Sequence, residues 1–313
     1  MELPLTAVPE PDASLEPEGF VVVVEPGDRI HFLDWGAVPT GLGAAPGVLA
    51  VHGLSQTAWA WAPVARRLGG TAGPRHVVTM DLRGHGLSDA PTDDGAYDLA
   101  VQGLDVEAVA EGSGLLSAGA DDRVVLAGHG FGAVVAATAA VGLGDRCAGL
   151  LLVDGGWELL EEATGVDPDE FLRGLDEPPE VMRSLGAFLA DRRGFDPASW
   201  DADQKRAAEA TVVETHAGRV VPSTRPHALE ACVRAMFTYD PSATLAAIEA
   251  PVLALMAADD ETGSRARALD AVSTARVAAG QRPIEVVRFG LDGHNLMRYR
   301  PREVAAAILS LAD

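Results

Sequence analysis

The stretch Leu126–Ala133, LAGHGFGA, decides the fold class of this chain. It closes an apolar, β-branched run, RVVLA, and opens a run of small and apolar residues, FGAVVAATAAV, that is typical of a buried helix. Gly128 and Gly132 are spaced as in G-x-S-x-G, the sharp strand-to-helix turn that presents a nucleophilic serine. The central position of this turn is Gly130, which carries no side chain. The sequence therefore predicts the turn without its nucleophile.

Outward from this turn, apolar strand-like runs alternate with helix-like runs along most of the chain. Such alternation predicts an α/β fold with a mainly parallel sheet that helices cover on both faces. The first two expected strands are separated by PGD and predict an antiparallel hairpin. The expected strands are 20–25, 29–36, 47–53, 76–84, 123–128, 148–156, 251–260 and 283–290, and the expected core helices are 55–70, 97–116, 131–142, 264–280 and 300–313.

Residues 157–250 break this pattern, because they are acidic and helical and contain no run typical of a buried strand. Two segments begin with Asp-Pro, an N-cap followed by proline at the first helical position. A third segment places five apolar residues on one helical face: Val181, Met182, Leu185, Phe188 and Leu189. An insertion with such a face predicts a lid, part of which lines a pocket.

The composition narrows the class of partner. The net charge of −22 argues against binding to nucleic acid or to anionic membranes, which favour basic surfaces. The apolar runs are shorter than a membrane span. Residues 1–19 have neither a basic start nor an apolar core, so we expect a disordered acidic arm and a cytoplasmic protein. Cys147 and Cys232 match no metal spacing and are expected to be free thiols. No metal cluster, phosphate-cradling loop or dinucleotide fingerprint occurs in the sequence, so we expect no metal and no cofactor.

Five polar segments follow predicted strands: VHGLS, DLRGHGLSD, AGHGFGA, AADDE and LDGHNLM. With these motifs in this order, the chain resembles the α/β-hydrolase superfamily, in the capped branch of epoxide hydrolases, C–C bond hydrolases and esterases. The resemblance implies a mostly parallel eight-stranded sheet flanked by helices. It also implies a core formed by residues 20–156 and 251–313, with residues 157–250 as a helical cap inserted before the strand that carries the catalytic acid.

The resemblance also implies roles for individual residues. Gly130 occupies the nucleophile position, Asp260 the acid position and His294 the base position. Asp259 is the alternative to Asp260, and Asp154, which also follows a strand, is a minor candidate. The backbone N–H groups implied for an oxyanion hole belong to Leu54 and Phe131.

Other residues near these motifs have two interpretations each. His129 and Trp61 either pack within the fold or contact substrate. Met182, Leu185, Phe188 and Leu189 are the candidate contacts from the lid. Packing or loop-shaping roles are expected for His85 and Trp59, and neither Ser55 nor Ser88 sits on the nucleophile turn.

Three functions remain compatible with a glycine at the nucleophile position. The first is an enzyme in which a His–Asp dyad acts on a small neutral or apolar substrate, by hydrolysis or by lyase-type base chemistry. The second is a ligand-binding pseudoenzyme. The third is a serine esterase inactivated by a change from serine to glycine. The sequence leaves the oligomeric state open.

Overall fold

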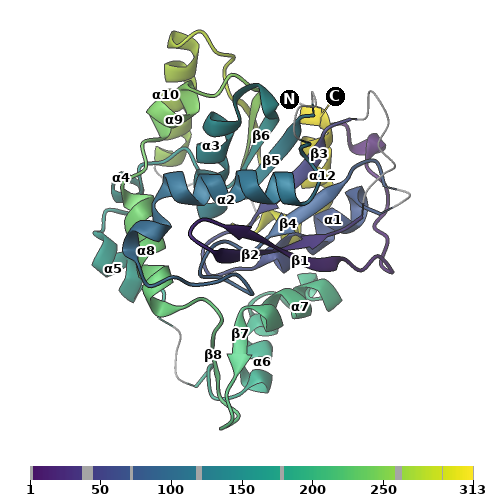
Figure 1. Cartoon of the computed structure of the whole chain (residues 1–313), viewed down its shortest axis with the longest axis vertical. Coiled ribbons are helices and arrows are strands. Elements are labelled where there is room, and N and C mark those ends of the chain that lie inside the picture. The colour runs from purple at the N-terminus through teal and green to yellow at the C-terminus, as the bar shows by residue number, and fades with distance from the viewer. Residues whose placement is uncertain are drawn as a thin grey trace.

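Eight strands form one sheet in the order β1-β2-β4-β3-β5-β6-β9-β10 (Figure 1). In this computed structural model, β1 and β2 form an antiparallel hairpin, β2 pairs antiparallel with β4, and all other neighbours are parallel. The predicted α/β-hydrolase fold, with its mostly parallel sheet, is therefore confirmed. The strands are β1 Glu18–Val24, β2 Asp28–Asp34, β3 Gly47–Val51, β4 Val77–Met80, β5 Val124–His129, β6 Cys147–Val153, β9 Val252–Met256 and β10 Glu285–Arg288.

The structure describes residues 3–36, 45–70, 73–117, 122–176, 180–257, 263–290 and 292–312. Within these ranges, no helix is long and apolar enough to cross a membrane.

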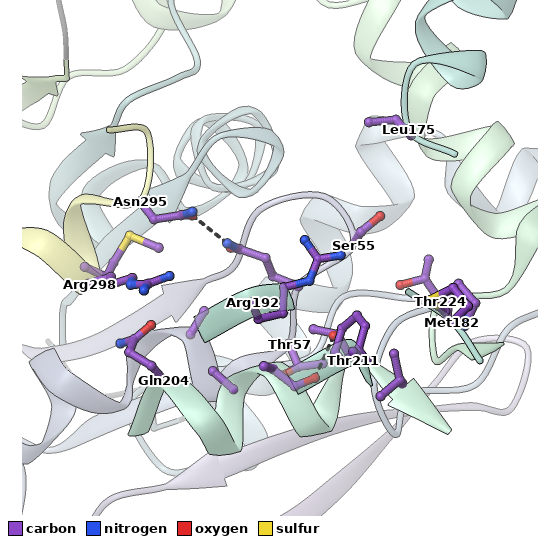
Figure 2. A pocket seen from close by; sticks show the side chains of 18 of the residues that line it. Ser55, Thr57, Leu175, Met182, Arg192, Gln204, Thr211, Thr224, Asn295 and Arg298 are labelled. Atoms are coloured by element: carbon purple, nitrogen blue, oxygen red, sulfur yellow. Dashed lines mark hydrogen bonds between the residues drawn. The ribbon is translucent and has the colours of Figure 1, made fainter. Parts of the chain in front are cut away.

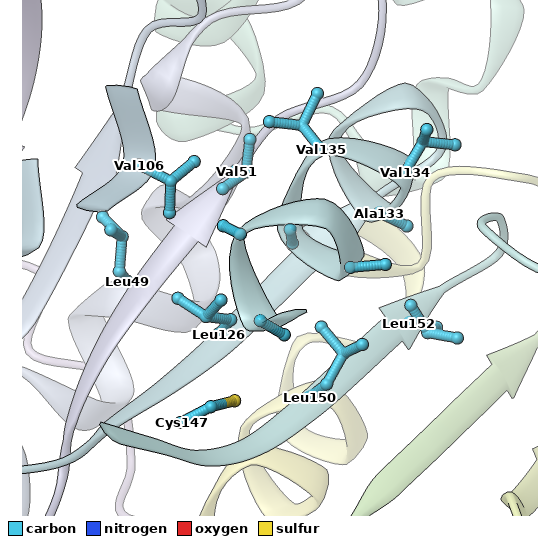
Figure 3. Close-up of a cluster of buried hydrophobic side chains, with 14 of the residues drawn as sticks. Leu49, Val51, Val106, Leu126, Ala133, Val134, Val135, Cys147, Leu150 and Leu152 are labelled. Carbon is cyan, nitrogen blue, oxygen red and sulfur yellow. The ribbon is translucent and has the colours of Figure 1, made fainter. Parts of the chain in front are cut away.

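Two apolar cores lie on opposite faces of the sheet, because successive side chains of a strand point to opposite faces. In β5, Val124 and Leu126 belong to one core (Figure 3), whereas Val125 and Ala127 belong to the other. The first core is covered by α2 Leu99–Gly112, α3 Phe131–Leu143, α9 Pro241–Ala246 and α10 Ser264–Ala278. The second is covered by α1 Ala62–Leu68, α11 Leu296–Tyr299 and α12 Pro301–Ala312.

The insertion between β6 and β9 is mainly helical, as predicted, but it also contains a short hairpin that the sequence analysis missed. Its strands β7 Val212–Glu214 and β8 Val220–Pro222 pair antiparallel. Two valine-rich segments on either side of a turn at Gly218, where φ is 75°, explain the hairpin. In Figure 1 this hairpin, α6 and α7 lie together beyond one end of the sheet. The helices of the insertion are α4 Leu160–Thr164, α5 Pro168–Arg173, α6 Leu185–Phe195, α7 Ala202–Ala210 and α8 Pro226–Phe237. Helix α9 also lies between β6 and β9, but it packs on α3 and α10 and so belongs to the core.

Both expected Asp-Pro helix starts are present, since Asp167 caps α5 and Asp196 caps a short 3-10 turn, Pro197–Ser199. The expected apolar face of the insertion is only partly helical, because Ser184 caps α6 and Val181 and Met182 precede the helix. These residues nevertheless share one small apolar cluster with Phe188 and Val220.

The segment before β1 differs from the expected disordered arm. Leu5–Ala7 packs against α12, whereas Pro9 and Asp12 bind Arg67 and the backbone of Arg66 in α1. The buried Arg66 side chain holds the following residues. Its guanidinium donates to the backbone oxygen of Leu15 and to Glu16 Oε1, at 2.9 Å from the latter. The same group donates to Asp203 of α7 at 3.0 Å. One buried cation therefore ties the amino-terminal segment and the insertion to the core, an arrangement that composition alone does not reveal.

The turn between β5 and α3 packs tightly against the end of β3. A methyl group on Gly132 would stand 2.3 Å from the backbone oxygen of His52 and 2.4 Å from that of Val51. We therefore expect Gly132→Ala to lower the free energy of unfolding by about 1–3 kcal/mol or more, because backbone atoms of a central strand must move.

Urea denaturation followed by circular dichroism measures this change. Gly186→Ala in α6 is the matched control, because no atom lies within 4 Å of the added methyl group. An unchanged midpoint for Gly132→Ala would contradict the packing described here.

Candidate active site

The predicted nucleophile turn is present and leads from β5 through Gly130 into α3. Gly130 has φ 52° and ψ −116°, a conformation that L side chains rarely adopt. A Cβ atom built on Gly130 would lie 3.1 Å from Nε2 of His294. The turn therefore directs its side-chain position at an imidazole nitrogen, although the residue itself supplies no reactive atom.

His294 lies in the loop between β10 and α11, and its partner is Asp154. Its Nδ1 atom is 2.6 Å from Oδ2 of Asp154. The predicted acid Asp260 and its alternative Asp259 lie outside the described residues. Among the described residues, the carboxylate that binds Nδ1 of His294 is therefore that of Asp154, the minor candidate of the sequence analysis.

Asp154 directly follows β6, and three groups hold its buried carboxylate. Besides His294, Oδ1 accepts a hydrogen bond from the Ala257 N–H at 2.8 Å and from Arg265 Nη1 at 2.9 Å. Burial opposes the charged form, but the bond to His294 and the charge of Arg265 outweigh it and hold the pKa of Asp154 below its usual value. The carboxylate is thus kept ionised where it faces the imidazole.

Arg265, at the start of α10, was not singled out by the sequence analysis. Its Nε also donates to Glu158, at 3.1 Å from Oε2. A signal for Asp154 did exist in its position at the end of a strand and in the glycines that follow it. Its φ of 49° is unusual for a residue other than glycine and marks a constrained position.

Gln56 connects three segments of the site and was also missed. Its Oε1 accepts from the Gly53 N–H at 3.0 Å and lies 3.0 Å from Nδ1 of His129. Its Nε2 donates to Asn295 Oδ1 at 2.7 Å. One amide thus joins the loop after β3, the nucleophile turn and the loop that carries His294. Nothing in its local sequence distinguishes Gln56 from a surface glutamine.

His129 is buried, and its ring centroid lies 4.3 Å from that of His294. Its Nε2 lies 3.1 Å from the backbone oxygen of His294. Burial and the neighbouring His294 hold the pKa of His129 well below its ordinary value, so the ring is neutral. His129 therefore contacts the loop that carries His294, and it does not line the cavity between the insertion and the core.

The two segments expected to supply the N–H groups of an oxyanion hole lie beside Gly130. Phe131 is the first residue of α3, and N–H groups of a first helical turn have no acceptor within their helix. Gly53, which precedes Leu54, has its Cα 3.9 Å from the Cβ position of Gly130. Both segments therefore border the space above Gly130.

A cavity of about 320 Å³ lies between the insertion and the core, next to the His294 loop (Figure 2). Met182 and Phe188 line it, as expected. The other four expected contacts, which include His129, are absent from this lining. Trp61 is buried in the core beside α1, and Leu185 and Leu189 pack within the apolar cluster of the insertion.

The residues expected to have structural roles have defined contacts. Ser88 accepts from the His31 N–H at 2.9 Å and donates to Asp81 O at 2.7 Å. The guanidinium of Arg206 lies over the ring of Trp59 at 3.9 Å. Ser55 lines the cavity. Among the described residues, no three His, Cys, Asp or Glu side chains form a group that could hold a metal ion.

Three buried imidazoles near the site should make the free energy of unfolding depend on pH. Burial lowers the pKa of His52 and His129, and it lowers that of His85 to about 3. Unfolding exposes these rings, which then take up protons below pH about 6.5. Because the unfolded chain binds more protons, stability should fall as the pH drops from 6.5 to 5.5, by up to about 1.4 kcal/mol per pH unit for each ring.

Urea unfolding at pH 7.5, 6.5 and 5.5 measures this slope. His85→Asn should reduce the slope, whereas His216→Asn, which changes an exposed ring in the β7–β8 turn, should not. A stability that does not change across this range would contradict neutral burial of the three rings.

Comparison with known proteins agrees with this architecture. The model of the "Alpha/beta hydrolase family" matches residues 48–307. Epoxide hydrolase 4 of Mus musculus is 29% identical over 125 residues, which are 40% of this chain and 31% of that protein. The alignment thus spans less than a third of that relative.

Two solved structures show the same fold. E-2-(Acetamidomethylene)succinate hydrolase has a TM-score of 0.74 at 21% identity, covering 95% of this chain and 99% of that one. A thioesterase domain from the curacin biosynthetic pathway has a TM-score of 0.72 at 20% identity, covering 94% and 99%. Since the family model spans most of the chain, the protein belongs to the alpha/beta hydrolase family.

Proposed function

We propose that this chain is an enzyme, a hydrolase in which His294 and Asp154 form a general-base dyad without a serine nucleophile. One observation carries the proposal. His294 Nε2 faces the space above Gly130, 3.1 Å from where a Cβ would stand, while its Nδ1 is bonded to Asp154. The hydrolytic relatives named above support the reaction class.

The dyad's hydrogen bond sets the tautomer of the base. Because Nδ1–H donates to the Asp154 carboxylate, the lone pair on Nε2 is free to accept a proton. A water molecule in the space above Gly130 would donate one proton to Nε2 as its oxygen attacks a substrate carbonyl carbon. The carbonyl π electrons would move to oxygen, and the Leu54 and Phe131 N–H groups would stabilise that oxyanion. The imidazolium would then return the proton to the leaving group as its bond breaks.

The same base could instead remove a proton from carbon, which would give lyase-type chemistry without water. The substrate class depends on the side chains that line the cavity rather than on the dyad. In hydrolysis and in lyase-type chemistry alike, His294 acts as the base and Asp154 as its hydrogen-bond partner.

Removal of the His294 imidazole should slow turnover strongly. We expect His294→Ala to lower the hydrolysis rate of p-nitrophenyl acetate, used as an activated probe, by about 10²–10⁴-fold. Asp154→Asn should lower it by a similar factor, because the amide no longer selects the correct tautomer. Stopped absorbance assays at 405 nm measure both, and the wild-type chain should show turnover without labelling by a fluorophosphonate.

His216→Ala is the matched control, since this exposed histidine lies in the insertion turn and should leave the rate unchanged. A pseudoenzyme would bind ligands saturably without turnover, in the wild type and in His294→Ala alike. That result would reject the dyad mechanism.

Restoring the hydroxyl tests whether the turn still supports acyl-enzyme chemistry. We expect Gly130→Ser to gain fluorophosphonate labelling, because its Oγ would lie beside His294 Nε2. The Cβ contact requires the imidazole to move by a few tenths of an ångström, and this side chain is 56% exposed. The positive φ should cost about 1–3 kcal/mol of stability.

Gly130→Ala carries the same backbone strain without the hydroxyl and serves as the control, and Gly130→Ser with His294→Ala should lose the labelling. A folded Gly130→Ser protein that resists labelling would contradict the proposed alignment of the turn and the base.

A further inference from the structure

The cavity beside the proposed dyad contains two arginine side chains. Arg298, in α11 of the core, and Arg192, in α6 of the insertion, both line it. Figure 2 shows both guanidinium groups directed into the space between Asn295, Ser55 and Gln204. Apolar walls are supplied by Met182 and Phe188, as in many small-molecule sites with few polar groups.

Arg298 is held in place by neutral acceptors. Its Nε donates to Ser199 Oγ at 2.6 Å, and its Nη2 donates to the backbone oxygen of Asp196 at 2.9 Å. The Asp196 carboxylate binds the Ser199 hydroxyl and the Ala198 N–H, and together with these bonds the nearby charge of Arg298 helps to lower its pKa. Across the described ranges, no carboxylate lies within ion-pair distance of Arg298, and no hydrogen bond of its Nη1 is found. The guanidinium is thus oriented, with one N–H₂ group left toward the cavity.

This arrangement differs from that of three other arginines in a chain that has 46 acidic and 24 basic residues. Arg66 pairs with Glu16 and Asp203, Arg83 with Asp28 and Asp105, and Arg265 with Asp154 and Glu158. Within the described part of the chain, the buried Arg276 also has no carboxylate partner, but backbone oxygens surround its guanidinium and it does not line the cavity. With carboxylates so abundant, an oriented arginine without one marks a place where a ligand can supply the anion. Guanidinium groups bind carboxylates with directional, charge-assisted hydrogen bonds.

We propose that the cavity binds the carboxylate of a small organic acid through Arg298, with Arg192 adding positive charge from the insertion. This inference rests on the proposed function, because it names the substrate class of the same site. It revises the expectation of a neutral substrate, which was based on the net charge of −22. Charges on the distant surface are screened over about 8 Å at physiological ionic strength, so the arginines inside the cavity dominate.

The location of Arg298 connects this anchor to the chemistry. It follows His294 by four residues, and Asn295 between them is fixed by its bond to Gln56. Asn295, which directly follows His294, and Gln56 both line the cavity, so a short molecule bound at Arg298 would lie next to the segments that carry the proposed base. A cavity of about 320 Å³ suits an acid of this small size.

Isothermal titration tests the anchor without requiring turnover. The probes are succinate, glutarate and benzoate, each paired with its neutral amide, together with inorganic phosphate. We expect at least one acid to bind the wild-type chain tenfold or more tightly than its amide. Arg298→Gln should lower the affinity for that acid by about 10–100-fold and leave the affinity for the amide unchanged. Arg298→Lys should recover only part of the loss, because it keeps the charge but not the planar fork.

Arg300→Gln is the matched control, because Arg300 pairs with Asp292 at 2.9 Å and does not line the cavity. Thermal denaturation confirms that each variant is folded. His294→Ala should still bind the acid although it loses turnover. A wild-type chain that binds the acid but shows no turnover would overturn the dyad and leave the anchor intact. The anchor is overturned if no acid binds better than its amide, if Arg298→Gln binds the acid as wild type does, or if phosphate binds more tightly than every carboxylate.

Discussion

A single hydrogen bond of 2.6 Å, from His294 Nδ1 to Asp154 Oδ2, connects the last loop of the core to the end of β6, 140 residues earlier. It fixes which nitrogen of His294 carries the proton and which way the ring faces. With Nδ1 bound, Nε2 is the nitrogen that faces the position above Gly130. Without this bond, the exposed imidazole would have no defined relation to the nucleophile turn, and the proposed chemistry would have no base.

The fold keeps Asp154 charged inside a largely apolar sheet. Strand β6 lies between β5 and β9, and its residues are buried along their length. A lone carboxylate at this depth would favour its neutral form. Arg265 from α10 and the Ala257 N–H at the end of β9 supply compensating interactions. The charged state of Asp154 therefore depends on β6, β9 and α10, which the fold brings together.

Charge is distributed unevenly between the surface and the site. The chain as a whole is strongly acidic, yet the cavity beside the dyad contains Arg192 and Arg298. The buried Arg66 likewise binds carboxylates from both the amino-terminal segment and the insertion. These arginines are partly or fully removed from water and fixed in position, so each interacts with a nearby anion more strongly than an exposed surface charge does.

Local sequence patterns were sufficient to predict the parallel sheet, the β5–α3 turn with Gly130 at its centre and the loop that carries His294, because strand periodicity and turn geometry depend on neighbouring residues. It could not choose between the carboxylates that follow two different strands, since Asp154 and the pair Asp259 and Asp260 have similar local settings. Only the tertiary structure placed Asp154 against His294, gave Gln56 its three partners and bound Glu16 to Arg66. These contacts join residues far apart in the chain, and side-chain hydrogen bonds over such separations depend on how strands and helices are stacked rather than on any local pattern.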